Sequence, residues 1–530
     1  MMRRLVHGVG LALAGVLAGA LFAAPAGAEP VRVDGGLVEG IGLPDGVDAW
    51  LGVPFAAPPV RDLRWKAPQP VVPWQGVYHA DRFAPECLQP LRSPRQNHYF
   101  GNEASSEDCL YLNIWAPKSA KKLPVVVWIY GGGFNIGSAS MANYSGEPLA
   151  KAGVVRVNIA YRVGPLGFLA HPELSNEGGG ASGNYGLMDQ VAALEWVKRN
   201  IAQFGGDPAN VTIAGQSAGS MAVALLQLSP KAKGLFARAI GMSGSPFGGM
   251  LGPAPLARAE AQGLVLQQEL GATSLADLRA LPGDRVTAAT SARDPIVIDR
   301  RYVTGRAEDV FAARRQNDVP LLIGYTLDES FRPLGAIKDA PALKGAVEAR
   351  FGAAAPAILA AYADANPARA AADIARDATI GRQMAGWADH QRRFGTAPAY
   401  AYLFTRRQPY APGVTFSDHD PATVGAYHTG DVPYWLRTRD SLNLFRTTRN
   451  WQPGDLSLER EMSDALLSFA LTGVPASPQA GRWPTFSEDG PQLVWLGLES
   501  RVTDWPHYAD MRLLGTPVEQ PRPAGARPRD

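Results

Sequence analysis

The chain has 530 residues, of which 46% are hydrophobic and 19% are charged, a composition typical of a globular protein rather than a disordered or membrane-spanning one. Two of its 51 basic residues lie in an N-terminal stretch (residues 1–28) that holds no acidic residue, which leaves 49 basic and 49 acidic residues in the remainder. A remainder without net formal charge argues against nucleic acid or an anionic membrane as a partner.

Residues 1–28 have the layout of a secretory signal. Arg3 and Arg4 precede an apolar stretch that ends in small residues at positions 26–28, which is typical of a cleavage site. We predict cleavage after Ala28 and export to the periplasm or the exterior, by the general or the twin-arginine route. No later segment is apolar for long enough to predict a membrane span.

The two cysteines of the chain are Cys87 and Cys109. An even number of cysteines in an exported protein predicts a disulfide. The bridge would close the loop from Cys87 to Cys109 and stabilise the fold by roughly 3 kcal/mol. The alternative is two buried free thiols.

Strands and helices alternate along the chain. Short apolar segments after residue 30, broken by Gly and Pro-Asp-Gly, predict a small antiparallel sheet. Continuous apolar runs at 123–130 and 154–161 predict strands that are buried on both faces. Arg156 in the second run predicts an edge position or a partner for its charge. The further predicted elements are a helix that closes at Gly205 and Gly206, a strand at 211–214, a helix from Ala218, strands at 320–325 and 399–405, and alanine-rich helices such as 341–364.

This alternation predicts an α/β fold with a large, mostly parallel central sheet flanked by helices. We expect one domain over residues 29–515. The Pro- and Arg-rich residues 516–530 predict a disordered tail.

One serine lies on a predicted sharp turn between a strand and a helix. In "VTIAGQSAGS", Ser217 stands between Gly215 and Gly219, and a G-x-S-x-G motif in this context exposes the hydroxyl above the sheet as a nucleophile. The glycines avoid a clash where strand and helix cross. The alternative is a hydroxyl in a flexible loop. The similar "GMSGS" lacks the last glycine, so its Ser243 and Ser245 are interpreted as structural.

A glycine run follows the first buried strand. In "WIYGGGFNIG" the strand ends at Gly131, Gly132 and Gly133, where the backbone can approach a substrate oxygen closely. Backbone N–H groups at such a site stabilise the negative charge of an acyl-transfer transition state. The alternative is a mobile turn.

These segments together resemble the type-B carboxylesterase (cholinesterase-like) family of the α/β-hydrolase superfamily. The similarity extends from about Gly35 to Leu496 and is carried by four segments: "WLGVPFAAPPVRDLRW", "SEDCLYLNIW", "GNYGLMDQVAALEWVKRNIAQFGGDPANVTIAGQSAGS", and "LLSFALTGVP" with "RWPTF". The resemblance implies the α/β-hydrolase fold and hydrolysis of a small-molecule ester by water without a metal or cofactor.

The resemblance also implies a Ser-His-Glu triad. Ser217 would be the nucleophile, Glu329 in "LLIGYTLDESF" the acid and His428 in "GAYHTGDVPYWL" the base, in the chain order that this fold requires. The neighbouring Asp328 is the alternative acid, and His419, which we expect in a solvated loop, is the alternative base.

Further positions carry implied roles. The family places the oxyanion hole at the amides of Gly132, Gly133 and Ala218. It also implies the Cys87–Cys109 disulfide and a structural ion pair nearby; the pair joins Arg64 and Glu107, and surface exposure would make it weak.

Two departures from the family bear on the substrate. Gln216 stands where the family often has a glutamate, and Tyr99 matches, in a loose alignment, a tryptophan that binds quaternary ammonium by cation–π contact. We therefore expect uncharged esters as substrates. The alternatives are a lipase or amidase with the same triad, or a non-catalytic binding module with this fold. The sequence carries no signal for an oligomeric state.

Overall fold

The computed structural model describes residues 28–90, 104–248, 252–291, 293–363 and 365–515. The predicted signal up to residue 27, the predicted tail 516–530 and Tyr99 lie outside the described residues.

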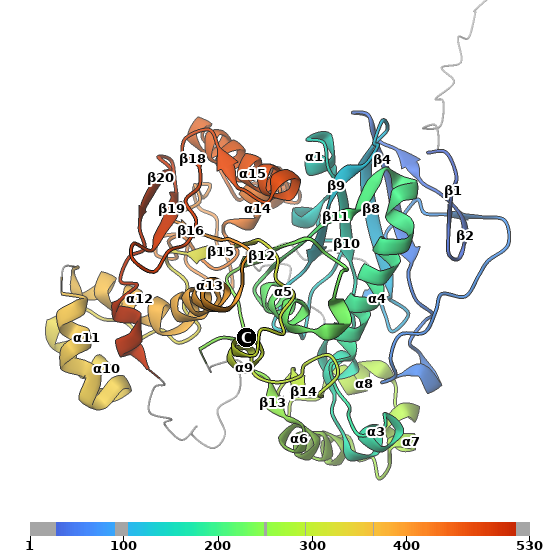
Figure 1. Cartoon of the computed structure of the whole chain (residues 1–530). Helices are drawn as coiled ribbons and strands as arrows, with labels where there is room; N and C mark the ends of the chain where they lie inside the picture. The colour runs from blue at the N-terminus through green and yellow to red at the C-terminus, as the bar shows by residue number, and fades with distance from the viewer. Residues whose placement is uncertain (1–27, 91–103, 249–251, 292, 364, 516–530) are drawn as a thin grey trace, which may run out of the picture.

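An 11-stranded sheet forms the centre of the molecule (Figure 1). In spatial order its strands are β20 (Arg501–Asp504), β19 (Gln492–Leu496), β16 (Ala399–Phe404), β15 (Leu321–Thr326), β12 (Arg238–Met242), β11 (Gly206–Gln216), β9 (Leu123–Ile129), β10 (Val155–Ile159), β8 (Tyr111–Pro117), β4 (Val47–Pro54) and β3 (Ile41–Gly42). The strands from β19 to β10 pair in parallel, and the antiparallel pairs lie toward the two edges. The prediction of a large, mostly parallel sheet is confirmed.

The small N-terminal sheet is mixed rather than purely antiparallel. It consists of β1 (Val31–Val33), β2 (Gly36–Glu39) and β5 (Val77–His79). β1 and β2 pair antiparallel as expected, whereas β5 returns from far along the chain and pairs with β2 in parallel. Local turn signals predict only the first pairing, because the second depends on a distant segment.

Arg156 does not lie at a sheet edge, contrary to one of the two expectations. β10 lies between β9 and β8, and the side chain of Arg156 is fully buried. Its guanidinium lies 5.2 Å from the ring centroid of Trp128 and donates to the carbonyl oxygen of Val126 at 3.4 Å. Burial lowers the pKa of Arg156 to about 9, so the guanidinium still carries its charge at neutral pH. The partner of this cation is the aromatic ring of Trp128.

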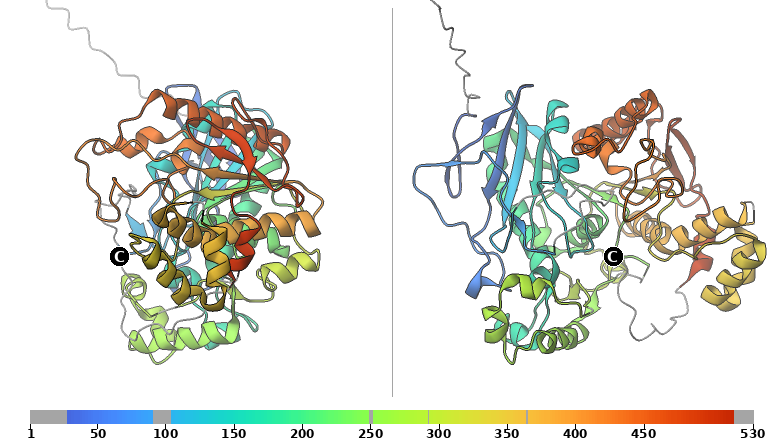
Figure 2. Two further views of the ribbon diagram at one scale, coloured as in Figure 1. Left: turned by 90° about the vertical axis from the view of Figure 1, so that its left-hand side faces the viewer. Right: turned by 180° about the vertical axis from the view of Figure 1, so that it is seen from behind.

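Helices cover the sheet on both sides (Figure 1; Figure 2). The longer ones are α4 (Tyr185–Asn200), α5 (Ala218–Leu228), α6 (Leu256–Glu269), α10 (Ala340–Phe351), α12 (Pro367–Arg376), α13 (Arg382–Phe394) and α15 (Pro453–Thr472). α10, α11 (Ala355–Ala361) and α12 form a separate group with its own apolar core at one end of the molecule. No helix of the described residues is both long and apolar enough to cross a membrane.

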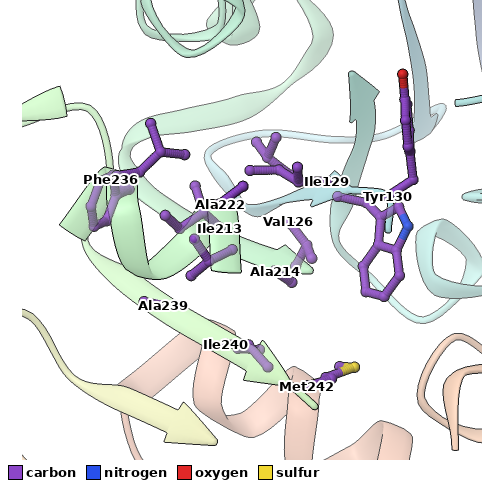
Figure 3. Packing of buried hydrophobic residues seen from close by; sticks show 14 of the residues in the cluster. Val126, Ile129, Tyr130, Ile213, Ala214, Ala222, Phe236, Ala239, Ile240 and Met242 are labelled. Atoms are coloured by element: carbon purple, nitrogen blue, oxygen red, sulfur yellow. The ribbon is translucent and has the colours of Figure 1, made fainter. Parts of the chain in front are cut away.

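The main core lies between the central strands and α5. Figure 3 shows Val126, Ile213 and Ile240 of three neighbouring strands packed together with Ala222 of α5. All four side chains are fully buried. This packing fixes the end of β11 and the start of α5, where the serine motif lies.

The segment before β8 is secured by a disulfide and a partly buried ion pair. The Sγ atoms of Cys87 and Cys109 lie 2.10 Å apart. Nearby, the Nε atom of Arg64 donates to Glu107 at 2.7 Å, and its Nη1 atom donates to the carbonyl oxygen of Leu281 at 2.8 Å. The Arg64 and Glu107 side chains are 6% and 17% exposed, so the pair is largely withdrawn from water and is not the exposed, weak pair that we considered.

Candidate active site

Ser217 occupies a sharp turn between β11 and α5. Its φ is +58° and its ψ is −125°, a backbone conformation that a serine adopts only at a cost of about 1–3 kcal/mol. The turn is held by the N–H of Ser217, which donates to the carbonyl oxygen of Met242 on the neighbouring β12 at 2.7 Å. The strain and its fixation match a nucleophile turn rather than a flexible loop.

The two glycines of the motif are required by close backbone contacts. A Cβ atom on Gly219 would lie 2.1 Å from the carbonyl oxygen of Ile129, and a Cβ on Gly215 would lie 2.5 Å from the backbone of Gly219. Both distances are shorter than any non-bonded contact allows. The strand and the helix therefore cross at a separation that only glycine permits.

The glycine run after β9 faces this turn. Gly132 and Gly133 have φ values of +109° and +63°, and a Cβ on Gly132 would lie 2.2 Å from the carbonyl oxygen of Ile136. Among the described residues, nothing accepts a hydrogen bond from the N–H of Gly132 or Gly133. Ala218 is the first residue of α5, and an N–H at this position has no acceptor within its helix. Three N–H groups are thus available to an anion.

Glu329 lies just beyond β15, and its carboxylate is fixed from three sides. One oxygen accepts from the hydroxyl of Ser243 at 2.8 Å and from the N–H of Thr326 at 2.7 Å. The other oxygen forms a short hydrogen bond with Nδ1 of His428. The Glu329 carboxylate is almost fully buried, whereas the His428 side chain is 30% exposed, so the imidazole can meet a substrate.

Asp328 points elsewhere. One of its oxygens pairs with Arg369 of α12, and the other accepts from the N–H of Ala426 at 2.8 Å. A Cβ on Gly425 would lie 2.2 Å from the second oxygen, so the loop before His428 rests tightly against this carboxylate. Asp328 holds the histidine loop, and Glu329 alone of the two acids contacts the imidazole.

The second ring nitrogen of His428 faces Gln216. The Nε2 atoms of the two side chains lie 3.1 Å apart. Because Nδ1 lies against the carboxylate, Nε2 is the acceptor of the neutral ring, and the Gln216 amide donates to it. Among the hydrogen bonds of the described residues, none joins the hydroxyl of Ser217 to His428, and such bonds often form only when substrate is bound.

The alternative histidine is packed among aromatic rings rather than solvated. The ring of His419 stacks on Phe416 and Tyr427 at centroid distances of 4.7 and 5.5 Å. Its Nε2 atom lies 2.9 Å from the hydroxyl of Tyr410, and Nδ1 lies 3.1 Å from Asp418. Both nitrogens are occupied by structural partners, contrary to the expected solvated loop.

Sequence reasoning missed three neighbours of the site. Ser243, which we interpreted only as structural, has a φ of +58° and donates to Glu329. The ring of Phe331 meets the ring of His428 edge-on at 5.5 Å. Asp431 is fully buried three residues after His428 and accepts from the hydroxyl of Tyr402 at 2.7 Å. The unfinished glycine motif around Ser243 was the one available signal among the three.

Burial raises the pKa of Asp431 to about 6, and the negative charge of Glu329 contributes, whereas the Tyr402 hydrogen bond opposes the rise.

A cavity of about 210 Å³ opens in front of the serine. Its walls combine apolar side chains with backbone from the glycine run and include Ser217, Gly133, Phe134, Met221, Asp294 and Phe331. The cavity therefore brings the serine hydroxyl and the glycine amides to one space large enough for a small organic group. In the described part of the chain, no group of three or more His, Cys, Asp or Glu side chains is arranged to hold a metal ion.

Known proteins resemble this chain along nearly its whole length. The model of the Carboxylesterase family matches residues 28–513. The Fumonisin B1 esterase of Sphingopyxis macrogoltabida is 37% identical over 86% of this chain and 84% of its own length. The para-nitrobenzyl esterase of Bacillus subtilis is 33% identical over 87% of this chain and 94% of its own. A solved structure titled PNB esterase, 31% identical, covers 92% of this chain and 99% of its own with a TM-score of 0.77, which agrees with the predicted α/β-hydrolase fold. The chain thus belongs to the carboxylesterase family, the resemblance seen in its sequence, and is a carboxylic ester hydrolase.

Proposed function

We propose that the chain hydrolyses carboxylic esters without a cationic group through an acyl-enzyme on Ser217, with His428 as the base and Glu329 as the acid. The observation that carries the proposal is the hydrogen-bonded chain from Ser243 through Glu329 to His428, which ends beside the strained turn of Ser217. A buried carboxylate on Nδ1 leaves the Nε2 lone pair of a neutral imidazole to accept a proton.

The proposed reaction has two halves. His428 takes the proton of Ser217 as the Oγ atom bonds to the ester carbonyl carbon, and the resulting oxyanion lies against the N–H groups of Gly132, Gly133 and Ala218. The imidazolium then protonates the leaving alcohol as the ester C–O bond breaks. A water molecule attacks the acyl-serine in the same way, and the acid leaves while Ser217 regains its proton.

Export is a second part of the proposal. Its support is the signal-like layout of residues 1–28 together with the Cys87–Cys109 disulfide, because disulfides persist in oxidising compartments. Protein from the periplasm or medium should begin at Glu29 when its N-terminus is sequenced, and recovery of the protein in the cytoplasm alone with Met1 intact would contradict export.

The test of the chemistry is replacement of the proposed nucleophile. Ser217→Ala should lower kcat for 4-nitrophenyl butyrate at least about a thousandfold, the scale of triad knockouts, with the circular dichroism spectrum unchanged. A fluorophosphonate should label Ser217 in the parent protein, as read by mass spectrometry of the peptide.

Ser245→Ala is the matched control. Ser245 is fully buried, whereas Ser217 is partly exposed, and the Ser245 hydroxyl donates to the carbonyl oxygen of Gln383 at 2.8 Å, outside the proposed triad. We expect this variant to retain activity. A folded Ser217→Ala protein with parental activity would contradict the assignment.

A further inference from the structure

An arginine lies beside the candidate oxyanion hole. The Nη2 atom of Arg293 donates to Oδ1 of Asn135 at 2.5 Å. The amide of the same Asn135 donates to the carbonyl oxygen of Gly133 at 3.1 Å. Arg293 directly precedes Asp294, which lines the cavity together with Ser217. One amide side chain therefore separates the guanidinium from the glycine run.

The charge of Arg293 has no counterion close by. Among the described residues, no carboxylate lies within 4 Å of its guanidinium. The adjacent Asp294 is turned away and pairs with Nε of Arg258 at 2.8 Å and with the amide of Gln262 at 3.1 Å, both on α6. The charge of Glu269 opposes the effect of burial on the pKa of Arg293, and the oxygens of Glu269 accept from residues 290 and 291.

The guanidinium is partly withdrawn from water, yet it remains charged. Burial lowers the pKa of Arg293 to about 10, so the side chain is protonated at neutral pH. Its neighbour Asn135 offers only a neutral oxygen. A cation that is partly dehydrated and lacks a counterion attracts an anion more strongly than a solvated one.

We infer that Arg293 is a specificity-determining residue that binds a second, anionic group of the substrate, so that esters carrying a free carboxylate are preferred over their neutral counterparts. The inference rests on the proposed function, because it places the ester carbonyl at Ser217 and the carboxylate at Arg293, which is adjacent in the chain to the cavity-lining Asp294. The planar fork of a guanidinium matches a carboxylate. The departures from the family at Gln216 and Tyr99 disfavour cationic esters, and they do not bear on anionic ones.

The experiment compares two esters that differ only in this charge: mono(4-nitrophenyl) adipate and its methyl ester. The measured quantity is the ratio of their kcat/KM values. The parent protein should favour the anionic ester, and Arg293→Gln should lower the ratio about ten- to a hundredfold through KM, the range for hydrogen bonds to a charged group. Arg293→Lys should give an intermediate ratio.

A second variant should remove the attraction between Arg293 and an anionic substrate without removing the arginine. Asn135→Asp supplies Arg293 with a permanent carboxylate partner and should lower the ratio as Arg293→Gln does. Arg306→Gln, which removes an exposed arginine at the start of α9 (Ala307–Ala312), is the control and should leave the ratio unchanged. Equal losses for both esters in Arg293→Gln would mean that Arg293 merely supports the glycine run, and would overturn the inference.

Binding without turnover separates this inference from the proposed function. The monoanilide of adipic acid, an amide analogue, is titrated by calorimetry into Ser217→Ala protein with and without Arg293→Gln. At least tenfold weaker binding without Arg293 supports the anion site even if neither ester is hydrolysed, an outcome that would refute the proposed function alone. Unchanged binding refutes the anion site.

Discussion

The buried carboxylate of Asp431 should make the stability of this protein depend on pH in a way that Asp431→Asn removes. Its pKa is raised from 3.8 to about 6, so the folded protein binds this proton more tightly than the unfolded chain does. For a raised carboxyl pKa the favourable contribution is complete below the unfolded pKa and is lost as pH rises through the folded pKa. The window of this loss runs from about pH 4 to pH 7.

The magnitude follows from the two pKa values. A difference of about 2 units corresponds to about 3 kcal/mol, of which about 2 kcal/mol is lost between pH 4.5 and pH 7.5. The Asn variant carries no such dependence. Asp431→Asn also lowers the free energy of unfolding by about 1–3 kcal/mol at every pH. One carboxylate oxygen of Asp431 is buried without a hydrogen-bond partner, and the other accepts from Tyr402. The N–H₂ group of the asparagine would replace one of these two oxygens and would find no acceptor there.

The assay is scanning calorimetry of both proteins at pH 4.5 and pH 7.5. With an unfolding entropy of about 1 kcal/mol/K for a chain of this size, the Tm of Asp431→Asn relative to the parent should rise by about 2 °C between the two pH values. Asp440→Asn, which neutralises an exposed carboxylate nearby, is the control and should show no such change. Parallel pH curves for Asp431→Asn and the parent would refute the reasoning from burial.

Two comparisons test the acid and the base. Glu329→Gln should lower kcat for 4-nitrophenyl butyrate about a thousand- to ten-thousandfold, as loss of a triad carboxylate does. Asp328→Asn should lower kcat about tenfold or less, because it mainly loosens the loop before His428. The opposite order of the two losses would move the role of the acid to Asp328. His428→Ala should abolish turnover. His419→Ala should retain most of the activity, and it should lower the Tm because it leaves a gap between stacked rings. Equal activity losses in the two variants would reopen the choice of base.

The parts of the fold that depend on local chemistry could be predicted from the sequence. The β-branched run of β9 has no polar residue that could face water, so a strand buried on both faces was the natural interpretation. Arg156 broke the same pattern in β10, because a cation can be buried over an aromatic ring that lies on a neighbouring strand. Likewise the parallel pairing of β5 with β2 joins segments that no local signal connects.

At the site, too, local sequence predicts some features, and others depend on contacts between distant segments. The turn at Ser217 follows from two glycines adjacent in sequence, and the structure explains both through contacts of 2.1 and 2.5 Å. The contact of Glu329 with His428 spans 99 residues of sequence, and only the resemblance to a family indicated it. Arg293 approaches the site through the fold alone, so neither motif nor composition could have assigned it to the site, and for Ser243 the unfinished glycine motif was the one local signal.

Gln216 occupies the ring nitrogen of His428 that the proposed reaction uses. Its amide lies 3.1 Å from Nε2 of His428, and an amide N–H₂ is a donor that requires an acceptor. In the proposed reaction the same Nε2 lone pair takes the proton of Ser217. The serine hydroxyl must therefore replace the Gln216 amide as the donor to Nε2 before attack. Because Gln216 and Ser217 are adjacent at the end of β11, this exchange needs only a small movement of side chains.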